Sequence, residues 1–363
     1  VRNCENDFLK FMPRNVLFFI FDDLSTLALR EGPFRARTPH LDALISRGAN
    51  FLNAHCTSPL CGPARAALWT GVSPLQSGLN GFDQQRNDWR QNAVLKGAPT
   101  LMERFFEAGF DVEGTGKIFH NGHERFDVWR RHDGKAAFGV PSGFGPMPHD
   151  GKTARWLPHP ELAPPMNQFS PQAWDNSFAP LSRVPHWPAQ PEENIPGYRG
   201  WWDERLQKPF RWQSPTDRDA LFDEQNAAWA SEFLRSRGEN GRPFFLGVGL
   251  NRPHCPLYAP DEFFDLYPPE KIPDLPENSL ENLPEALWKG EHGASGRRRL
   301  NQLLETGGTA LYKEWIRSYL ACASFADAQV GAVLRALWES GLEDETLVVV
   351  TSDHGYHLGD KGV

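Results

Sequence analysis

The residues best placed for chemistry are a cysteine, a proline and an arginine at fixed offsets. They are Cys61, Pro63 and Arg65, and a run of small residues ending in Thr70-Gly71 follows them. Proline suits the first turn of a helix, so Cys61 is expected at or just before a helix N-terminus, where backbone N–H groups and the helix dipole favour an anion. Arg65, about one turn further on, would add a positive charge on the same side. The pattern indicates a reactive side chain in an anion site, and a buried structural cysteine is the alternative.

Two adjacent carboxylates, Asp22 and Asp23, directly follow the apolar run at residues 15–21. An uninterrupted apolar run of this length is typical of a parallel strand buried on both faces. Open α/β sheets place their ligands at the carboxyl ends of such strands, and two adjacent carboxylates repel each other unless a cation lies between them. A solvated turn or a helix N-cap is the alternative for an isolated Asp-Asp pair.

Polar residues also follow three other predicted strands, which span residues 110–116, 243–250 and 346–352. In chain order these residues are Lys117, His254, Asp353 and His354. Because the carboxyl ends of parallel strands share one edge of a sheet, we expect these side chains to meet Asp22 and Asp23 there. Taken singly, Lys117 would be a surface lysine and His254 a residue at the rim of a site.

Helical periodicity alternates with these strands, over residues 38–48, 99–108, 217–237 and 311–338. This alternation predicts an α/β fold with a mostly parallel central sheet and helices on both faces. A Pro-, Gly- and Trp-rich stretch at about 125–215 holds seven of the 13 tryptophans. It is predicted to be an insertion on the substrate side, whose tryptophans form a small core of their own more readily than they stack on sugars. The proline-rich residues 262–287 are predicted to form a wrapping loop.

Composition narrows the possible partners. The chain has 363 residues, 40% of them hydrophobic and 23% charged, with a formal net charge of −8. This charge argues against nucleic acid or an anionic membrane as the main partner. Five irregularly spaced cysteines give no disulfide or zinc pattern, no apolar run of membrane-spanning length is evident, and residues 1–14 lack a signal-peptide core. Localisation stays open, with the periplasm or the outside of the cell favoured over the cytoplasm.

The sequence Cys61-Gly62-Pro63-Ala64-Arg65, followed by Thr70-Gly71, resembles the signature of type I sulfatases in the alkaline phosphatase superfamily. Residues 38–48, 114–120, 251–256 and 352–360 also resemble this family, and residues 243–275 and 319–337 are most similar to iduronate-2-sulfatase and its bacterial relatives. The chain departs from the family pattern at Ala64, where serine is frequent, and at Arg252, where lysine is usual. The resemblance covers most of the chain except the insertion and the extreme N-terminus.

The resemblance implies that Cys61 is oxidised to formylglycine, whose hydrated aldehyde attacks the sulfur of a sulfate ester. It assigns the catalysis to Cys61, Arg65, Lys117, His120 and His254, with His254 as general acid and His120 as the base at the formylglycine hydroxyl. It assigns the metal to Asp22, Asp23, Cys61, Asp353 and His354. Three carboxylates and an oxygen nucleophile favour Ca²⁺, with Mg²⁺ as the alternative, over zinc.

The predicted function is therefore the removal of sulfate from a sulfated saccharide or another sulfate ester, with no nucleic-acid or membrane partner. A phosphonate or phosphate ester hydrolase, or a non-catalytic binder of sulfated sugar with unmodified Cys61, are the alternatives. A formylglycine-generating enzyme is the expected partner during maturation. The whole chain is expected to be the N-terminal catalytic domain, with the family's smaller C-terminal subdomain missing or on another fragment. Asn80, Asp83 and Trp89 are candidate contacts at the rim of the site, with ordinary loop residues as the alternative.

Overall fold

The computed structural model describes most of the chain outside the predicted insertion. The described residues are 14–81, 89–120, 129, 138–141, 178–184, 186–187, 189, 191–193, 196–199, 202–203, 208–237, 241–276 and 293–362.

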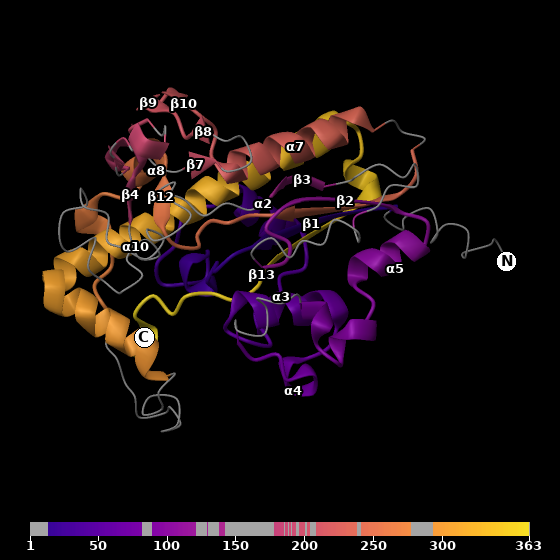
Figure 1. Cartoon of the computed structure of the whole chain (residues 1–363), viewed down its shortest axis with the longest axis horizontal. Coiled ribbons are helices and arrows are strands. Elements are labelled where there is room, and N and C mark those ends of the chain that lie inside the picture. The colour runs from indigo at the N-terminus through magenta and orange to yellow at the C-terminus, as the bar shows by residue number, and fades with distance from the viewer. Residues whose placement is uncertain are drawn as a thin grey trace.

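The central sheet is parallel, as the sequence predicts. Its five described strands lie in the order β13-β1-β11-β2-β3 (Figure 1), and every neighbouring pair runs in the same direction. The strands are β1 (Asn15–Phe21), β2 (Asp111–Gly116), β3 (Phe138–Pro141), β11 (Phe244–Gly249) and β13 (Thr346–Ser352). The register pairs Ile20 with Gly249 and Phe21 with Ser352. The residues that follow these strands therefore start at the same edge.

Helices cover both faces of the sheet. Leu17, Phe19 and Phe21 of β1 belong to a buried cluster with side chains of α2 (Pro39–Arg47), α7 (Phe222–Ser236) and α10 (Gly293–Glu339). Phe18 and Ile20 belong to a second cluster, with side chains of α3 (Cys61–Thr70) and α5 (Leu101–Glu107). Figure 1 shows α7 and α10 on one side of the sheet and α3 and α5 on the other. Burial on both faces explains why β1 is apolar without interruption.

Shorter elements complete the described fold. The helices are α4 (Pro74–Ser77), α8 (Asp261–Asp265) and the 3-10 turns Thr26–Ala28, Trp89–Gln91, Leu95–Gly97, Leu181–Arg183, Pro191–Glu193, Pro269–Lys271, Glu343–Glu345 and Asp360–Gly362. The short strands pair two by two: β4 (Phe178–Pro180) with β12 (Leu257–Ala259), β5 (His186–Trp187) with β6 (Tyr198–Arg199), β7 (Trp202–Asp203) with β8 (Lys208–Pro209), and β9 (Trp212–Ser214) with β10 (Asp217–Arg218).

The structure differs from the sequence prediction most clearly in two helices and one loop. The helix expected at 217–237 begins at Phe222, because residues 217–218 pair in β10. The helix expected at 311–338 extends back to Gly293, with a break at Gly308, whose φ of 63° is left-handed. The described part of 262–287 contains α8 and a 3-10 turn, so it is more regular than a wrapping loop.

The predicted insertion at 125–215 lies largely outside the described residues, so its substrate-side role stays a prediction. Trp129 is an exception to the expected separate core. It is buried in the cluster with α3 and α5, and it lies against Gly114 of β2 and Gly247 of β11. A methyl group on Gly114 would come within 2.6 Å of the Trp129 ring, so the glycine makes room for the indole. This tryptophan therefore belongs to the main core.

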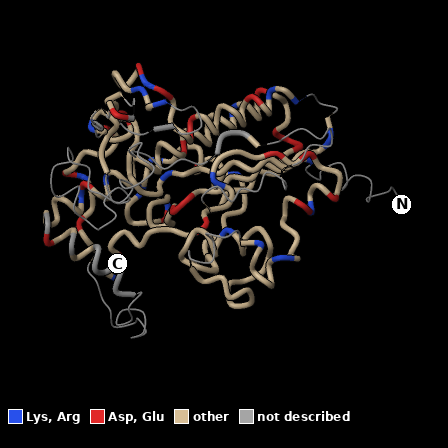
Figure 2. Tube along the Cα trace, in the orientation of Figure 1, with Lys and Arg blue, Asp and Glu red and all other residues tan. Residues whose placement is uncertain are grey.

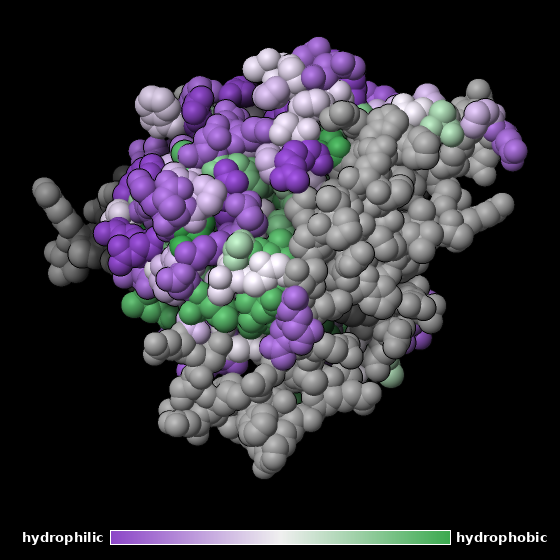
Figure 3. All heavy atoms as spheres, turned by 90° about the vertical axis from the view of Figure 1, so that its left-hand side faces the viewer, coloured by the Kyte–Doolittle hydropathy of each residue, from purple (hydrophilic) through white to green (hydrophobic). Residues whose placement is uncertain are grey.

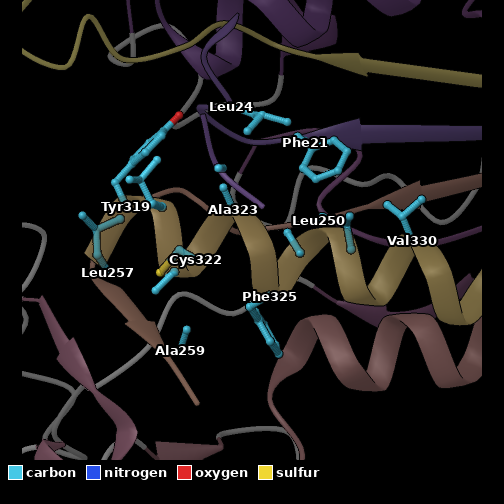
Figure 4. Packing of buried hydrophobic residues seen from close by; sticks show 14 of the residues in the cluster. Phe21, Leu24, Leu250, Leu257, Ala259, Tyr319, Cys322, Ala323, Phe325 and Val330 are labelled. Atoms are coloured by element: carbon cyan, nitrogen blue, oxygen red, sulfur yellow. The ribbon is translucent and has the colours of Figure 1, made fainter. Parts of the chain in front are cut away.

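The second half of α10 crosses the protein interior. Figure 4 shows Phe21 and Leu250, near the ends of β1 and β11, beside Ala323 and Val330 of α10. By length and composition, Gly307–Glu339 is apolar enough to cross a membrane, which corrects the expectation that no run reaches this length. However, 72% of its most apolar window is buried inside the protein, and the core helix of a globular domain passes the same test.

Charged residues of both signs alternate along the described chain in Figure 2, without a segregated basic face. Figure 3 shows the side at which α10 begins, where hydrophilic side chains surround a band of hydrophobic ones. Since no basic face stands out in the described part of the chain, a binding site for an anion there would come from a local group of cations.

Candidate active site and metal centre

Cys61 is the first residue of α3, as Pro63 predicts. The helix begins where Ala64 N–H donates to Leu60 C=O over 3.0 Å, and it ends at Gly71, whose φ of 71° is left-handed. The Cys61 side chain is buried, with the residue only 4% exposed. The helix N-terminus therefore points its backbone N–H groups into the interior, at the carboxyl edge of the sheet.

Arg65 is fully buried and joins the ends of three strands. Its Nε donates to Asp353 Oδ2 over 2.8 Å, and its Nη2 lies 3.2 Å from Phe21 C=O and 3.4 Å from Asp22 Oδ1. Its Nη1 donates to the carbonyls of Lys117 and Ile118. Burial lowers the pKa of Arg65, but the carboxylates of Asp353 and Asp22 have the larger combined effect. The net pKa is raised, so the guanidinium stays charged.

Lys117 is fully buried, so it is not a surface lysine. It follows β2, and its Nζ forms an ion pair with Asp22 Oδ2. Burial lowers the pKa of Lys117, yet the negative charges around it, with Asp22 the largest contributor, together raise it. Burial likewise raises the pKa of Asp22, but Lys117, His254 and Arg65 together hold it well below its usual value. Both groups are therefore ionised near neutral pH.

Asp23 has a left-handed backbone with a φ of 66°, which is uncommon outside glycine. Tyr319 of α10 stabilises this turn, because its hydroxyl donates to Asp23 C=O over 2.6 Å and accepts from Ser25 N–H over 2.8 Å. Asp23 N–H also donates to Asp353 Oδ1 over 3.1 Å. These contacts turn the Asp23 carboxylate toward His254 and His354.

His354 connects the cysteine to the acid pair. Its Nε2 lies 3.2 Å from Cys61 Sγ, and its Nδ1 lies 2.9 Å from Asp23 Oδ1. Burial lowers the pKa of His354, whereas the contacts with Asp23 and Cys61 raise it, to about 11. In the absence of a metal ion the imidazole is thus protonated, and it would have to release a proton to ligate a cation.

His254 approaches the same acid pair from the segment after β11. Its Nε2 lies 3.8 Å from Asp23 Oδ2, while its Nδ1 contacts the carbonyl of Cys255. Burial lowers the pKa of His254, but the charges of Asp22, Cys255 and Asp23 raise it well above its ordinary value. The imidazole can therefore hold a proton on Nε2, the nitrogen that faces the site.

The other predicted residues have different outcomes. His120 is half-buried in the turn after Lys117, and its role stays a prediction. Asn80 is exposed, and Asp83 lies outside the described residues. The expectation that Trp89 lies at the rim is wrong: its ring is buried and stacks on Phe119, with the ring centroids 5.3 Å apart.

The group of side chains at this edge fits a hard divalent cation. Asp22, Cys61, Asp353 and His354 each offer a ligand atom within 4.8 Å of the others, and Asp22, Asp23 and His254 form an overlapping group. Asp23 Oδ1 is buried and accepts no well-aligned hydrogen bond, although His354 Nδ1 is near. The three carboxylates, together with imidazoles that can release their protons, could therefore hold a metal ion.

Comparisons with known proteins agree with this geometry. The family model described as Sulfatase matches residues 14–363. A curated protein named Sulfatase from Formosa agariphila is 32% identical over 356 residues, which cover 96% of this chain and 60% of that protein. Iduronate 2-sulfatase from Homo sapiens is 29% identical over 359 residues, which cover 96% of this chain and 56% of that protein.

The fold is shared with solved structures. A phosphonate monoester hydrolase from Silicibacter pomeroyi has a TM-score of 0.57 at 20% identity, over 96% of this chain and 64% of that one. Identity this low shows the fold alone. The chain spans between half and two thirds of the length of the proteins it matches here.

Proposed function

This chain belongs to the sulfatase family, as the cysteine motif predicts, and on that premise we propose that the protein hydrolyses the sulfate ester of a sulfated saccharide. The observation that supports this most directly is the 3.2 Å contact between Cys61 Sγ and His354 Nε2 within a buried cluster of acids and cations. Both curated relatives are named as sulfatases, and one is named for iduronate, a sugar acid.

We propose that Cys61 is oxidised to formylglycine by a formylglycine-generating enzyme. Asp22, Asp23, Asp353 and His354 would hold the cation, Ca²⁺ in preference to Mg²⁺, together with the side chain at position 61. The aldehyde hydrate supplies a nucleophilic hydroxyl, and the cation supplies positive charge that favours its ionised form. Arg65 and Lys117 make their contacts with Asp353 and Asp22 through this chain's own side chains, independently of the cation and the aldehyde.

The charged side chains of this chain would then act on the ester. Lys117 and Arg65 are fixed at the helix N-terminus, where they would stabilise negative charge on sulfate oxygens without reorganising during the reaction. His254 can hold a proton on Nε2 while Nδ1 contacts the Cys255 carbonyl, so it is the candidate general acid for the departing alcohol. Burial of the acid pair keeps bulk water away from these charges.

The decisive experiment combines mass spectrometry with kinetics. The peptide that contains Cys61 is expected to carry an aldehyde in place of the thiol, and the purified protein is expected to hydrolyse 4-nitrophenyl sulfate. Cys61→Ala should abolish this turnover, whereas Cys56→Ala, which alters an exposed free cysteine, should retain it. An unmodified thiol in protein of full activity would overturn the proposal.

The same assay separates the alternatives. Hydrolysis of a phenyl phosphonate monoester at a higher kcat/KM than the sulfate would favour the phosphonate hydrolase. Binding of sulfated saccharide without turnover, with an intact thiol, would favour the non-catalytic binder. A panel of sulfated saccharides then identifies the sugar and the position of the sulfate.

The domain assignment remains a proposal. We propose that residues 1–363 form the catalytic domain of a sulfatase, completed by a C-terminal segment in the whole protein. The support is that the matched relatives extend well beyond the aligned region, with 60% and 56% of their lengths covered.

A further inference from the structure

The first turn of α7 contacts the segment that carries His254. Asp223, the second residue of α7, is buried at 2% exposure and accepts three hydrogen bonds from this segment. Oδ1 accepts from the backbone N–H and the side-chain Nδ2 of Asn251, at 2.8 and 3.0 Å, and Oδ2 accepts from Arg252 N–H at 2.9 Å. We propose that Asp223 is a positioning residue that fixes His254 for proton donation.

The segment after β11 is held from two sides. Leu250 N–H still bonds to Ile20 C=O at 2.9 Å, as an extension of the sheet, and the chain then turns, with His254 N–H donating to Asn251 C=O at 2.8 Å. Asp223 binds the N–H groups at the start of this turn. Because Asn251 begins the turn that His254 closes, a shift of Asn251 moves the imidazole directly.

Arg252 fixes the rest of the segment from inside. Its Nε donates to Tyr258 C=O at 2.9 Å and its Nη1 donates to His254 C=O at 3.1 Å. The Arg252 side chain is thus directed into its own loop. With its backbone N–H on Asp223, Arg252 transmits the position of that carboxylate to the backbone of His254.

The carboxylate does little for its own helix. Glu224, not Asp223, caps the start of α7, because its carboxylate accepts from Leu221 N–H at 2.6 Å, whereas all three hydrogen bonds described for Asp223 come from Asn251 and Arg252. A buried carboxylate costs free energy of desolvation unless its partners compensate it. Asp223 is therefore best explained by the segment it holds.

The variant Asp223→Asn keeps the shape and removes one acceptor. An amide has one oxygen, so at least one of the three N–H donors would face an NH₂ group and lose its partner. A matched control is Ser231→Ala on the same helix, where a buried hydroxyl that lies 3.4 Å from Ala332 C=O is removed. Asn251→Ala removes only the side-chain donor and serves if Asp223→Asn does not fold.

Hydrogen exchange tests the positioning without any assay of activity. In Asp223→Asn, the amides of Asn251, Arg252 and His254 should exchange about 10–100 times faster, because a buried donor loses its partner. Asn251→Ala should give a smaller change in the same direction, and Ser231→Ala should leave this segment unchanged. Unchanged protection of residues 251–254 in Asp223→Asn would overturn the inference.

Leaving-group dependence tests the link to proton donation, and this step rests on the proposed function. Asp223→Asn should lower kcat about 10–100-fold for an alkyl sulfate, whose alcohol needs a proton, and less than about 3-fold for 4-nitrophenyl sulfate. In a His254→Ala background the effect of Asp223→Asn should vanish, because both changes act on one proton transfer. Equal losses on both substrates, or an undiminished loss without His254, would reject the positioning role. If the wild-type protein hydrolyses neither sulfate, the proposed function fails instead, and hydrogen exchange still decides the role of Asp223.

Discussion

Arg65 Nε lies 2.8 Å from Asp353 Oδ2, although the two residues are 288 positions apart in the chain. Both side chains are fully buried. The same guanidinium reaches Asp22 and the carbonyls at the ends of β1 and β2. Arg65 is thus both a cation of the candidate site and a structural link between α3 and the two neighbouring strands that end in acids.

Arg65→Lys should be severely damaging despite the conserved charge. A lysine cannot reproduce the forked contacts to Asp353, Phe21 and the carbonyls beyond β2, so buried acceptors would lose their donors. We expect a loss of about 3–5 kcal/mol in the free energy of unfolding, measured by urea denaturation. Arg47→Lys, at an exposed ion pair with Glu343, is the control and should cost less than about 1 kcal/mol. Similar costs for the two variants would contradict the role assigned to Arg65.

Lys117→Met should separate cation binding from turnover. Removal of the ammonium leaves Asp22 Oδ2 without its lysine partner, while Arg65 still lies near Oδ1, so a divalent cation would have less competition for that carboxylate. We expect tighter Ca²⁺ binding by calorimetry together with a loss of kcat of about 100-fold or more on an aryl sulfate. Lys96→Met alters an exposed lysine and should change neither quantity. Weaker Ca²⁺ binding in Lys117→Met would show that Lys117 supports the cation site.

Added Ca²⁺ should stabilise the protein through the acid cluster. At 100 times its dissociation constant, a cation that binds only the folded state adds about 2.7 kcal/mol. Asp23→Asn should abolish most of the resulting rise in the thermal unfolding midpoint, because Asp23 Oδ1 is buried without a well-aligned partner. Asp274→Asn, at an aspartate with an 88% exposed side chain, should preserve it. If chelators leave the wild-type midpoint unchanged, no cation of this kind is bound.

Asp327, which lies outside the candidate site, should make the free energy of unfolding depend on pH. Burial raises the pKa of Asp327 to about 6. The hydrogen bonds that its carboxylate accepts from the backbone N–H groups of Leu41 and His40 lower the pKa, but burial has the larger effect. A raised pKa means that the folded state binds the proton more tightly, so this contribution is present below pH 4 and is lost as pH rises through 6. Relative to Asp327→Asn, the wild type should lose about 1 kcal/mol between pH 5 and pH 7. Denaturant titrations at both values measure the difference, and a constant difference would contradict the expectation.

Much of the fold could be predicted from periodicity and the residues at strand ends. The apolar run of β1 indicated a strand buried on both faces, and Pro63 indicated the start of α3 at Cys61. Parallel pairing then placed Asp22, Lys117 and Asp353 at one edge. These predictions succeeded because local sequence patterns determine element type, and a parallel sheet fixes where the ends of its strands lie.

Other features depend on contacts that no local pattern encodes. Tyr319 looks like any apolar position of α10, yet its hydroxyl holds Asp23 in a left-handed turn. Asp223 looks like an ordinary acidic residue in a first helical turn, yet it binds the segment of His254. Trp89 is a candidate rim contact in the sequence, but its ring is stacked in the core. The sequence around a polar side chain in a helix does not indicate which distant backbone group that side chain will bind.

The acid pair after β1 meets Asp353 across 330 positions of chain. During synthesis, Asp22, Asp23 and the helix that starts at Cys61 leave the ribosome long before β13 exists to cover them. If Cys61 is modified as proposed, its thiol, almost fully enclosed in the finished fold, would be most accessible to the modifying enzyme in that interval. The speed of translation and the arrival of β13 would then set how much time such an enzyme has.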